Sequence, residues 1–181
     1  MADATLVLIR HAESTWNSER RWQGWGDPPL SERGLEQAQA LARALAGEEI
    51  DALFTSDLLR AIQTAEPLAR ALGRQASPDR ALRELDIGAW TGLTREEISA
   101  CDAPILESFS SGDFHVRAPD GESRDELRRR VHERVAELVR AHPGGRLALV
   151  THRGVIGILR PGWRPGNAEW CQIDASQLEN S

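Results

Sequence analysis

Short apolar runs separated by segments of helical pattern are the feature that most constrains the fold of this 181-residue chain. Three such runs are Thr5 to Ile9, Asp51 to Thr55 and Leu147 to Thr151. Runs of this kind, rich in branched residues, are typical of strands that are buried on both faces in a parallel sheet. A further strand is predicted at Ala168 to Asp174. The alternation of strands and helices predicts an α/β fold built from crossover units.

Capping residues and apolar spacing predict three helices between these strands. The first follows Ser31 and ends near Gly47, the second runs from near Ser56 to about Leu72 with a distortion at Pro67, and the third begins at the capping box of Ser123 and Glu126 and stops at Pro143. The apolar face of the first helix is expected to include Leu35, Ala38, Ala42 and Leu45. The arginine run at residues 128–130 is expected on the solvated face of the third helix.

Residues 99–122 interrupt this alternation. Pro104, Gly112, Pro119 and Gly121 predict a loop-rich insertion that can include one short helix, and we expect it to form a small cap or lid. Residues 1–181 are otherwise expected to form a single domain, because the chain is too short for two ordinary ones.

Composition excludes several classes of function. All 22 basic residues are arginines, against 28 acidic residues and a net charge of −6. Without lysine, neither Schiff-base nor P-loop chemistry is available, and the acidic excess argues against a nucleic-acid partner. No apolar run is long enough to span a membrane and the start lacks a basic leader, so we expect a cytoplasmic protein without a membrane partner. Cys101 and Cys171 are too few for a disulfide scaffold or a zinc site.

Two predicted strands end in a histidine. The first continues into Arg10 and His11, and the other into Thr151 and His152. Because ligands gather at the carboxyl ends of parallel strands, we expect these side chains to share one site. The first turn of the helix that follows the predicted strand Asp51 to Thr55 is expected to bring Arg60 to the same edge.

This set suits phosphoryl chemistry. A neutral imidazole is a competent nucleophile toward phosphorus, and nearby guanidinium groups disfavour its protonation. The same guanidinium groups bind phosphoryl oxygens through paired hydrogen bonds and stabilise the transition state. A carboxylic acid would still be needed to protonate the leaving oxygen.

A series of sequence blocks in this order resembles the histidine phosphatase superfamily, in the branch that includes cofactor-dependent phosphoglycerate mutases and small-molecule phosphatases. The blocks are Leu8 to Asn17, Arg21 to Asp27, Pro29 to Ser31, Ser56 to Ala65, Leu82 to Trp90, Asp120 to Ser123 and Val150 to His152. The resemblance implies a three-layer α/β sandwich with a mostly parallel central sheet.

The resemblance also assigns roles to individual residues. It implies that His11 is the phosphorylated nucleophile, that Arg10, Arg60 and His152 bind the phosphoryl group, and that Glu84 donates the proton to the leaving oxygen. Asn17 corresponds to a phosphate-contacting amide, and Gln23 and Gly24 to positions that meet the rest of the substrate. The resemblance implies no metal.

These roles predict a metal-independent phosphomonoesterase that hydrolyses a small phosphorylated metabolite through a phosphohistidine. A phosphoglycerate mutase, with 2,3-bisphosphoglycerate as its cofactor, is the first alternative; the short cap favours hydrolysis. The second alternative is a non-catalytic phosphate-binding module. The hydrolase needs no cofactor, and the oligomeric state stays open.

Some positions depart from the family pattern or stay ambiguous. Arg153 follows the second histidine where glycine is common, and it is either a surface residue or an extra cation near the substrate. His115, within the expected cap, is a weaker candidate for substrate contact. The segment from Gly157 onward is shorter and richer in proline than is usual in the family.

Overall fold

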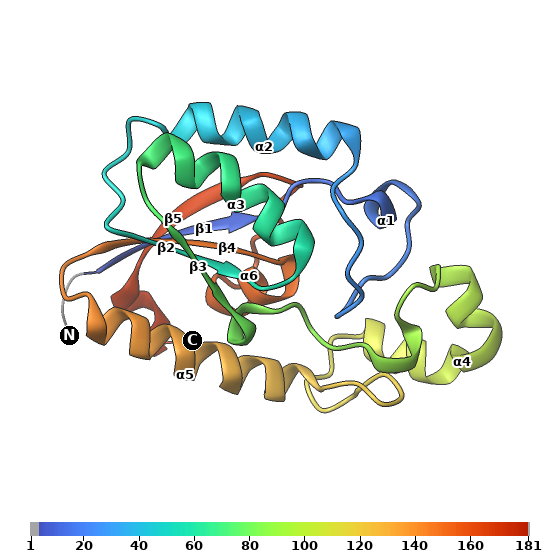
Figure 1. Ribbon diagram of the computed structural model, residues 1–181. Coiled ribbons are helices and arrows are strands. Elements are labelled where there is room, and N and C mark those ends of the chain that lie inside the picture. Colours follow the sequence, from blue (N-terminus) through green and yellow to red (C-terminus); the bar gives the residue numbers. More distant parts are fainter. Residues whose placement is uncertain (1–3, 181) are drawn as a thin grey trace.

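A five-stranded sheet forms the centre of the computed structural model, which describes residues 4–180 without the side chains of residues 179 and 180. The strands are β1 (Thr5–Arg10), β2 (Ala52–Ser56), β3 (Ala76–Asp79), β4 (Arg146–Thr151) and β5 (Trp170–Asp174). They lie in the order β3-β2-β4-β1-β5, and all neighbours are parallel except β5, which runs antiparallel to β1. The predicted α/β fold with a mostly parallel sheet is confirmed (Figure 1).

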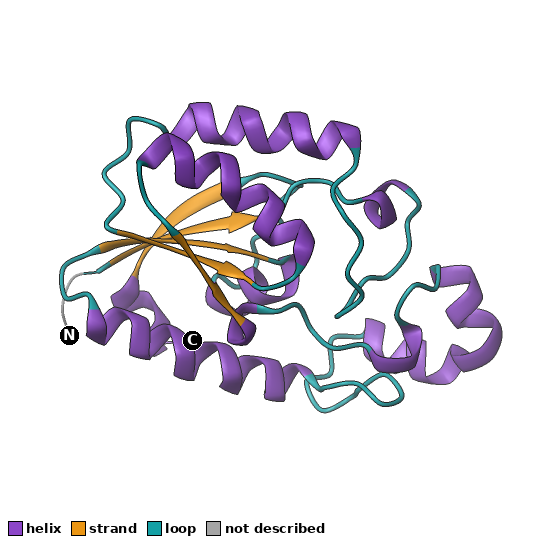
Figure 2. Ribbon diagram, in the orientation of Figure 1, coloured by secondary structure: helices purple, strands orange, loops and turns teal. Residues whose placement is uncertain are grey.

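Helices cover both faces of this sheet, which gives the three layers (Figure 2). The helices are α1 (Thr15–Ser18), α2 (Glu32–Leu45), α3 (Leu59–Leu72), α4 (Arg95–Ser110), α5 (Arg124–Ala141) and α6 (Arg153–Leu159), with the short 3-10 helices η1 (Arg80–Leu82), η2 (Gly88–Trp90) and η3 (Ala175–Asn180). Helices α2 and α3 pack on one face, and α5 and α6 on the other. Along residues 4–180, no helix combines the length and the apolar character that crossing a membrane would require.

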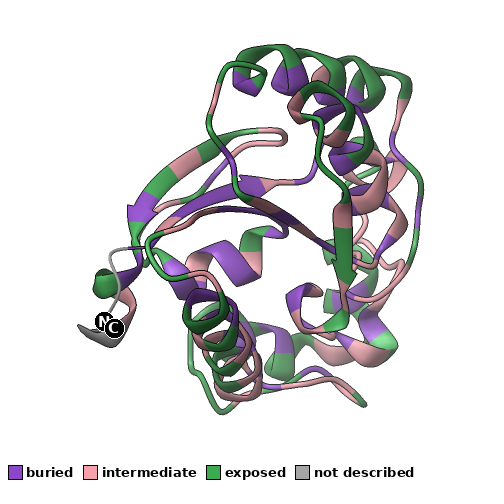
Figure 3. Cartoon of the chain, turned by 60° about the vertical axis from the view of Figure 1, so that its left-hand side comes forward, coloured by how far each residue is buried: buried purple, intermediate pink, exposed green. Residues whose placement is uncertain are grey.

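The central strands are buried on both sides, as their apolar runs predict. Leu6 and Leu8 of β1 belong to the core cluster that includes α5 and α6, whereas Val7 and Ile9 belong to the cluster that includes α2 and α3. All four side chains are fully buried. Figure 3 shows the same division, with the buried residues of the outer helices turned toward the sheet.

The predicted helices form with small differences. Ser31 caps α2 by accepting a hydrogen bond from the amide of Gly34 (3.0 Å). Leu35, however, is 50% exposed, so its assignment to the apolar face is wrong; Leu41 occupies that face instead. Helix α3 starts later than predicted, because β2 continues through Ser56. The capping box predicted at the start of α5 is confirmed.

Residues 99–110 are helical, so the predicted loop-rich character is wrong for this part of the insertion. Helix α4 begins at a capping box, in which Thr94 Oγ1 accepts from the Glu97 amide (3.2 Å) and Glu97 Oε2 accepts from the Thr94 amide (2.8 Å). The helix is interrupted at Asp102, whose backbone leaves the helical region two residues before Pro104. Figure 1 shows α4 on the side of the molecule toward which the parallel strands point.

Strand β3 was not predicted from the sequence. Its four residues, Ala76 to Asp79, include only one apolar residue besides a proline. It pairs with β2 alone at the edge of the sheet, where a proline is tolerated because half of the backbone groups need no partner.

Candidate active site

The parallel pairing of β1 with β4 brings the two predicted histidines together. Arg10 lies opposite Thr151 in the register, and the His11 amide donates to the Thr151 carbonyl (2.8 Å). The His11 and His152 rings are 5.1 Å apart between centroids, although the residues are 141 positions apart in the chain. The expectation that both strand ends contribute to one site is met.

His11 presents one defined nitrogen to the site. Its ring is buried, and its Nδ1 lies 2.7 Å from the Ala12 carbonyl oxygen. Because a carbonyl only accepts, Nδ1 carries the proton in the neutral ring and Nε2 keeps a free lone pair. Burial, followed by the charges of Arg60 and Arg10, lowers the pKa of His11 well below its ordinary value. The ring is therefore neutral at physiological pH.

His152 is held by a residue that the sequence interpretation did not single out. Its Nε2 lies 2.8 Å from the hydroxyl of Ser56 at the end of β2, and both residues are fully buried. Burial and the charge of Arg60 lower the pKa of His152 well below its ordinary value. The position of Ser56 at a strand end, and at the start of the block Ser56 to Ala65, could have identified it.

Two guanidinium groups, those of Arg10 and Arg60, lie near His11, and neither forms an ion pair with a carboxylate of the described residues. Arg60 is fully buried and donates to the carbonyls of Gly26 (2.7 Å) and Gly24 (2.8 Å). Arg10 donates to the Pro165 carbonyl (2.8 Å). Burial is the main cause that lowers the pKa of Arg60 to about 10 and also lowers that of Arg10, so both stay charged at neutral pH.

Three buried nitrogen atoms at this site lack a hydrogen-bond partner within the described protein. They are Nε of Arg10, Nε of Arg60 and Nδ1 of His152. A buried polar atom without a partner is costly, so such atoms call for an explanation. Two guanidinium groups with unused donors beside a second imidazole form a site suited to a small anion.

Glu84 contacts the same site from the loop that follows η1. Its Oε1 accepts from the amides of Leu85 (2.8 Å) and Gly154 (3.1 Å), and its Oε2 lies 3.2 Å from the latter amide. Gly154 is the second residue of α6, two positions after His152. A Cβ added at residue 154 would lie 2.1 Å from Glu84 Oε1, so a side chain there would displace the carboxylate. Glu84 is also close enough to raise the pKa of Arg10 and of Arg60 against the effect of burial.

The three predicted substrate-binding positions are connected to this centre by hydrogen bonds. Asn17 Oδ1 accepts from the Ser14 amide (3.1 Å), and Gln23 Oε1 accepts from the Ser14 hydroxyl (2.8 Å). Gly24, at a positive φ of 45°, turns its carbonyl to Arg60. In this structure Gly24 thus holds the Arg60 guanidinium through its backbone carbonyl.

Asn167 is a second site residue that the sequence interpretation missed. Its Nδ2 donates to Asn17 Oδ1 (3.1 Å) and to the His11 carbonyl (3.2 Å). It lies in the proline-rich C-terminal segment, where no motif marked it. These two bonds connect that segment directly to the candidate nucleophile.

The two ambiguous positions lie at the surface. The His115 side chain is 85% exposed, and its Nδ1 lies 2.8 Å from Asp125. Arg153 is exposed at the start of α6, and its charge is near enough to Arg10 to contribute to the lowered pKa there. No group of three or more His, Cys, Asp or Glu side chains in the described part of the chain is arranged to hold a metal ion.

Comparison with curated proteins finds relatives along most of the chain. The chain is 38% identical over 165 residues to phosphoglycerate mutase-like protein 4 of Arabidopsis thaliana. The alignment covers 90% of this chain and 72% of the relative. It is 36% identical over 154 residues to the Salmonella arizonae protein named "Probable phosphoglycerate mutase GpmB", covering 85% of this chain and 72% of the relative.

Solved structures with the same fold include phosphatases. A mycobacterial glucosyl-3-phosphoglycerate phosphatase in complex with VO3 superposes with a TM-score of 0.85 at 35% identity, covering 93% of this chain and 91% of that one. The alpha-ribazole phosphatase from Shigella flexneri superposes with a TM-score of 0.85 at 26% identity, and the superposition covers 94% of this chain and 90% of that one. The sequence model of one family matches residues 6–175, which include both strand-end histidines. The chain belongs to the histidine phosphatase superfamily (branch 1).

Proposed function

We propose that this protein is a metal-independent phosphomonoesterase that hydrolyses a small phosphorylated metabolite through a phosphohistidine at His11. The observation that carries the proposal is the hydrogen bond from His11 Nδ1 to the Ala12 carbonyl, because it fixes the tautomer with a lone pair on Nε2. The lowered pKa of His11 keeps that lone pair available at neutral pH.

In the first step, the Nε2 lone pair attacks phosphorus and the bond from phosphorus to the ester oxygen breaks. The electron pair of that bond goes to the leaving oxygen, which takes a proton from the Glu84 carboxyl group. In the second step, water gives a proton to the Glu84 carboxylate and attacks phosphorus. The bond from phosphorus to Nε2 breaks, its electron pair returns to the imidazole, and inorganic phosphate leaves.

The fixed cations supply the charge that this reaction needs. Arg10 and Arg60 are held by backbone carbonyls, which are neutral acceptors, so their charge is available to the phosphoryl oxygens. Positioned cations of this kind stabilise the transferring group without a metal ion. His152 can donate a further hydrogen bond. Asn17 can do the same through Nδ2, because its Oδ1 already accepts from Ser14 and Asn167.

Phosphate release from an aryl phosphate, in the presence and absence of a chelator, tests this proposal. His11→Asn keeps a donor for the Ala12 carbonyl but removes Nε2, and we expect it to lower turnover at least about 1,000-fold. His142→Asn is the matched control, because His142 also places Nδ1 near a backbone carbonyl, that of Leu138 (2.9 Å), far from the site in the fold. Equal turnover by the two variants would exclude His11 as the nucleophile.

A phosphoglycerate mutase is the second candidate, since one curated relative is named phosphoglycerate mutase-like and the other a probable phosphoglycerate mutase. In a mutase, the phosphohistidine returns its phosphoryl group to a substrate oxygen, and water must be kept out. With 3-phosphoglycerate and 2,3-bisphosphoglycerate, a mutase forms 2-phosphoglycerate faster than it releases phosphate. The phosphatase proposal predicts the reverse. Phosphate binding without any turnover would instead indicate the non-catalytic module.

We also propose that residues 99–122 act as a small cap within a single domain and contribute to the choice of substrate. Support comes from the place of α4 on the side toward which the parallel strands point. Its Phe109 packs against Trp22 (5.9 Å between ring centroids) and Trp90 (5.3 Å), which belong to two of the family-like sequence blocks. A screen of phosphorylated metabolites with wild type and Phe109→Ala should change the ranking of substrates; an unchanged ranking would refute this role.

A further inference from the structure

Arg130 contacts the backbone of the loop that carries Glu84. It lies on α5, and its guanidinium donates to the carbonyls of Ala81 (2.9 Å), Arg83 (3.0 Å) and Glu84 (3.2 Å). Its side chain is only 21% exposed. The expectation that the whole run of residues 128–130 lies on a solvated helix face is therefore wrong for Arg130.

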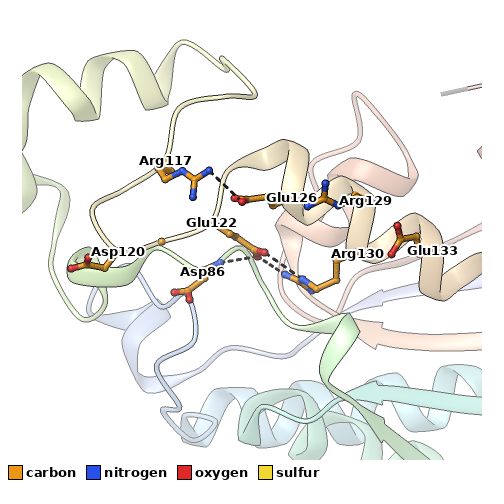
Figure 4. A pocket seen from close by; sticks show the side chains of 9 residues that line it. Asp86, Arg117, Asp120, Glu122, Glu126, Arg129, Arg130 and Glu133 are labelled. Atoms are coloured by element: carbon orange, nitrogen blue, oxygen red, sulfur yellow. Dashed lines mark hydrogen bonds and ion pairs between the residues drawn. The ribbon is translucent and has the colours of Figure 1, made fainter.

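Glu122 completes this contact from the loop that precedes α5. It forms an ion pair with Arg130 Nη2, and its Oε1 also accepts from the Asp86 amide (3.0 Å). The Glu122 amide in turn donates to the Asp86 carbonyl (3.0 Å). Figure 4 shows these three residues joined along one wall of a pocket of about 410 Å³. The Arg130–Glu122 pair therefore holds the chain on both sides of Glu84.

The arrangement demands arginine at this position. The guanidinium group has five N–H donors in a planar fork, and here it serves three carbonyls and one carboxylate. A lysine ammonium has three donors at a single point and cannot span these acceptors. Since both side chains are largely buried, their interaction is also screened less than that of a surface pair.

We propose that Arg130, with Glu122 as its counter-ion, is a positioning residue for the general acid Glu84. This inference rests on the proposed function, since it assumes that the Glu84 carboxyl group protonates the leaving oxygen. A proton donor works only within hydrogen-bond reach of the acceptor, and a displacement of about 1 Å can lower the rate about 100-fold. Within the described residues, the hydrogen bonds of the Arg130 guanidinium go to backbone carbonyls and to Glu122, so it holds Glu84 through the backbone of residue 84. Its charge also contributes to the lowered pKa of His152, an effect that does not depend on the leaving group.

The ratio of the rates on two esters with different leaving groups distinguishes a positioning role of Arg130 from a purely structural one. An alkyl phosphate has a basic leaving oxygen and depends on the proton donor, whereas 2,4-dinitrophenyl phosphate has a stable leaving anion and does not. Loss of folded protein lowers both rates by the same factor. Misplacement of Glu84 lowers only the rate with the alkyl ester.

The experiment compares Arg130→Met with Arg134→Met on glycerol phosphate and 2,4-dinitrophenyl phosphate. Arg134 is the matched control, one turn further along α5, and its guanidinium binds the carboxylates of Asp79 and Glu137 rather than the Glu84 loop. We expect Arg130→Met to lower kcat on the alkyl ester about 30-fold and on the activated ester less than about threefold. Arg134→Met should leave the ratio of the two rates unchanged.

A second variant keeps the test informative if Arg130→Met folds poorly. Glu122→Gln retains an acceptor for the Asp86 amide but removes the counter-ion, and it should shift the ratio in the same sense by a smaller factor. Equal losses on both esters in these variants would overturn the positioning role. If the wild type releases phosphate from neither ester, the proposed function fails instead, so the two failures are distinguishable.

Discussion

Gly154→Ala should displace the Glu84 carboxylate while leaving the fold intact. A Cβ at residue 154 would lie 2.1 Å from Glu84 Oε1, whereas a carbon and an oxygen atom in contact need about 3.3 Å. The carboxylate must therefore retreat by about 1 Å. It can do so, because it is the end of a flexible side chain, and outside helix α6 the three atoms nearest to that Cβ all belong to the Glu84 carboxylate.

Gly154→Ala is expected to lower kcat and to leave the free energy of unfolding nearly unchanged. A misplacement of about 1 Å is expected to lower kcat on an alkyl phosphate about 100-fold. The free energy of unfolding should fall little or rise, because alanine is favoured over glycine in a helix by up to about 1 kcal/mol. The binding of inorganic phosphate should change less than about threefold, since Arg10 and Arg60 do not move.

Gly157→Ala is the matched control in the same helix. Its added Cβ would meet only Arg164 Nη1, at an ordinary contact distance of 3.6 Å. Steady-state kinetics with both variants, together with urea unfolding followed by tryptophan fluorescence, separates rate from stability. If Gly154→Ala keeps the kcat of Gly157→Ala on the alkyl ester, Glu84 is not the proton donor in the position observed.

Two further predictions concern the buried cations and imidazoles. Arg60→Lys keeps the charge but loses the fork to the Gly24 and Gly26 carbonyls, so phosphate affinity measured by calorimetry should fall at least tenfold, or about 1.4 kcal/mol; unchanged affinity would contradict the role of the fork. The lowered pKa values of His11 and His152 mean that unfolding takes up protons below about pH 6.5, so stability is lost as the pH falls and is unaffected above it. Between about pH 7.5 and 5.5, one imidazole that stays neutral in the folded state lowers the free energy of unfolding by about 1.4 kcal/mol. Urea unfolding at these two pH values should therefore show a smaller decrease for His11→Asn than for the wild type, by up to about 1.4 kcal/mol.

The sheet and the strand-end residues were predictable because their signals are local. A strand buried on both faces must be apolar at every position, which makes the runs around Leu8 and Leu149 visible in the sequence. Parallel pairing then places whatever follows each run at one edge. His11 and His152 could therefore be brought together without knowledge of the strand order.

Strand β3 and helix α4 show where local signals fail. The residues Ala76 to Asp79 have low β-propensity, and they form a strand only because the edge of β2 offers backbone partners. Within α4, Pro104 was interpreted as a loop signal, but the chain accommodates it by leaving the helical conformation at Asp102 and resuming afterwards. Trp90 Nε1 donates to the Asp102 carboxylate (2.7 Å), a tertiary contact that no local pattern contains.

Arg130 illustrates a stricter limit on what the sequence can reveal about the site. Its neighbours Arg128 and Arg129 are exposed, and three consecutive arginines on a helix look alike in sequence. The surroundings of the three side chains differ because successive residues on a helix point about 100° apart, so only one of the three can face the loop of Glu84. That loop approaches α5 because Glu122 holds Asp86 through two hydrogen bonds, one from the Asp86 amide to the Glu122 carboxylate and one from the Glu122 amide to the Asp86 carbonyl. The environment that makes Arg130 distinct is thus built by residues distant in sequence, and only the folded chain distinguishes the arginine that holds the proposed acid from those that face solvent.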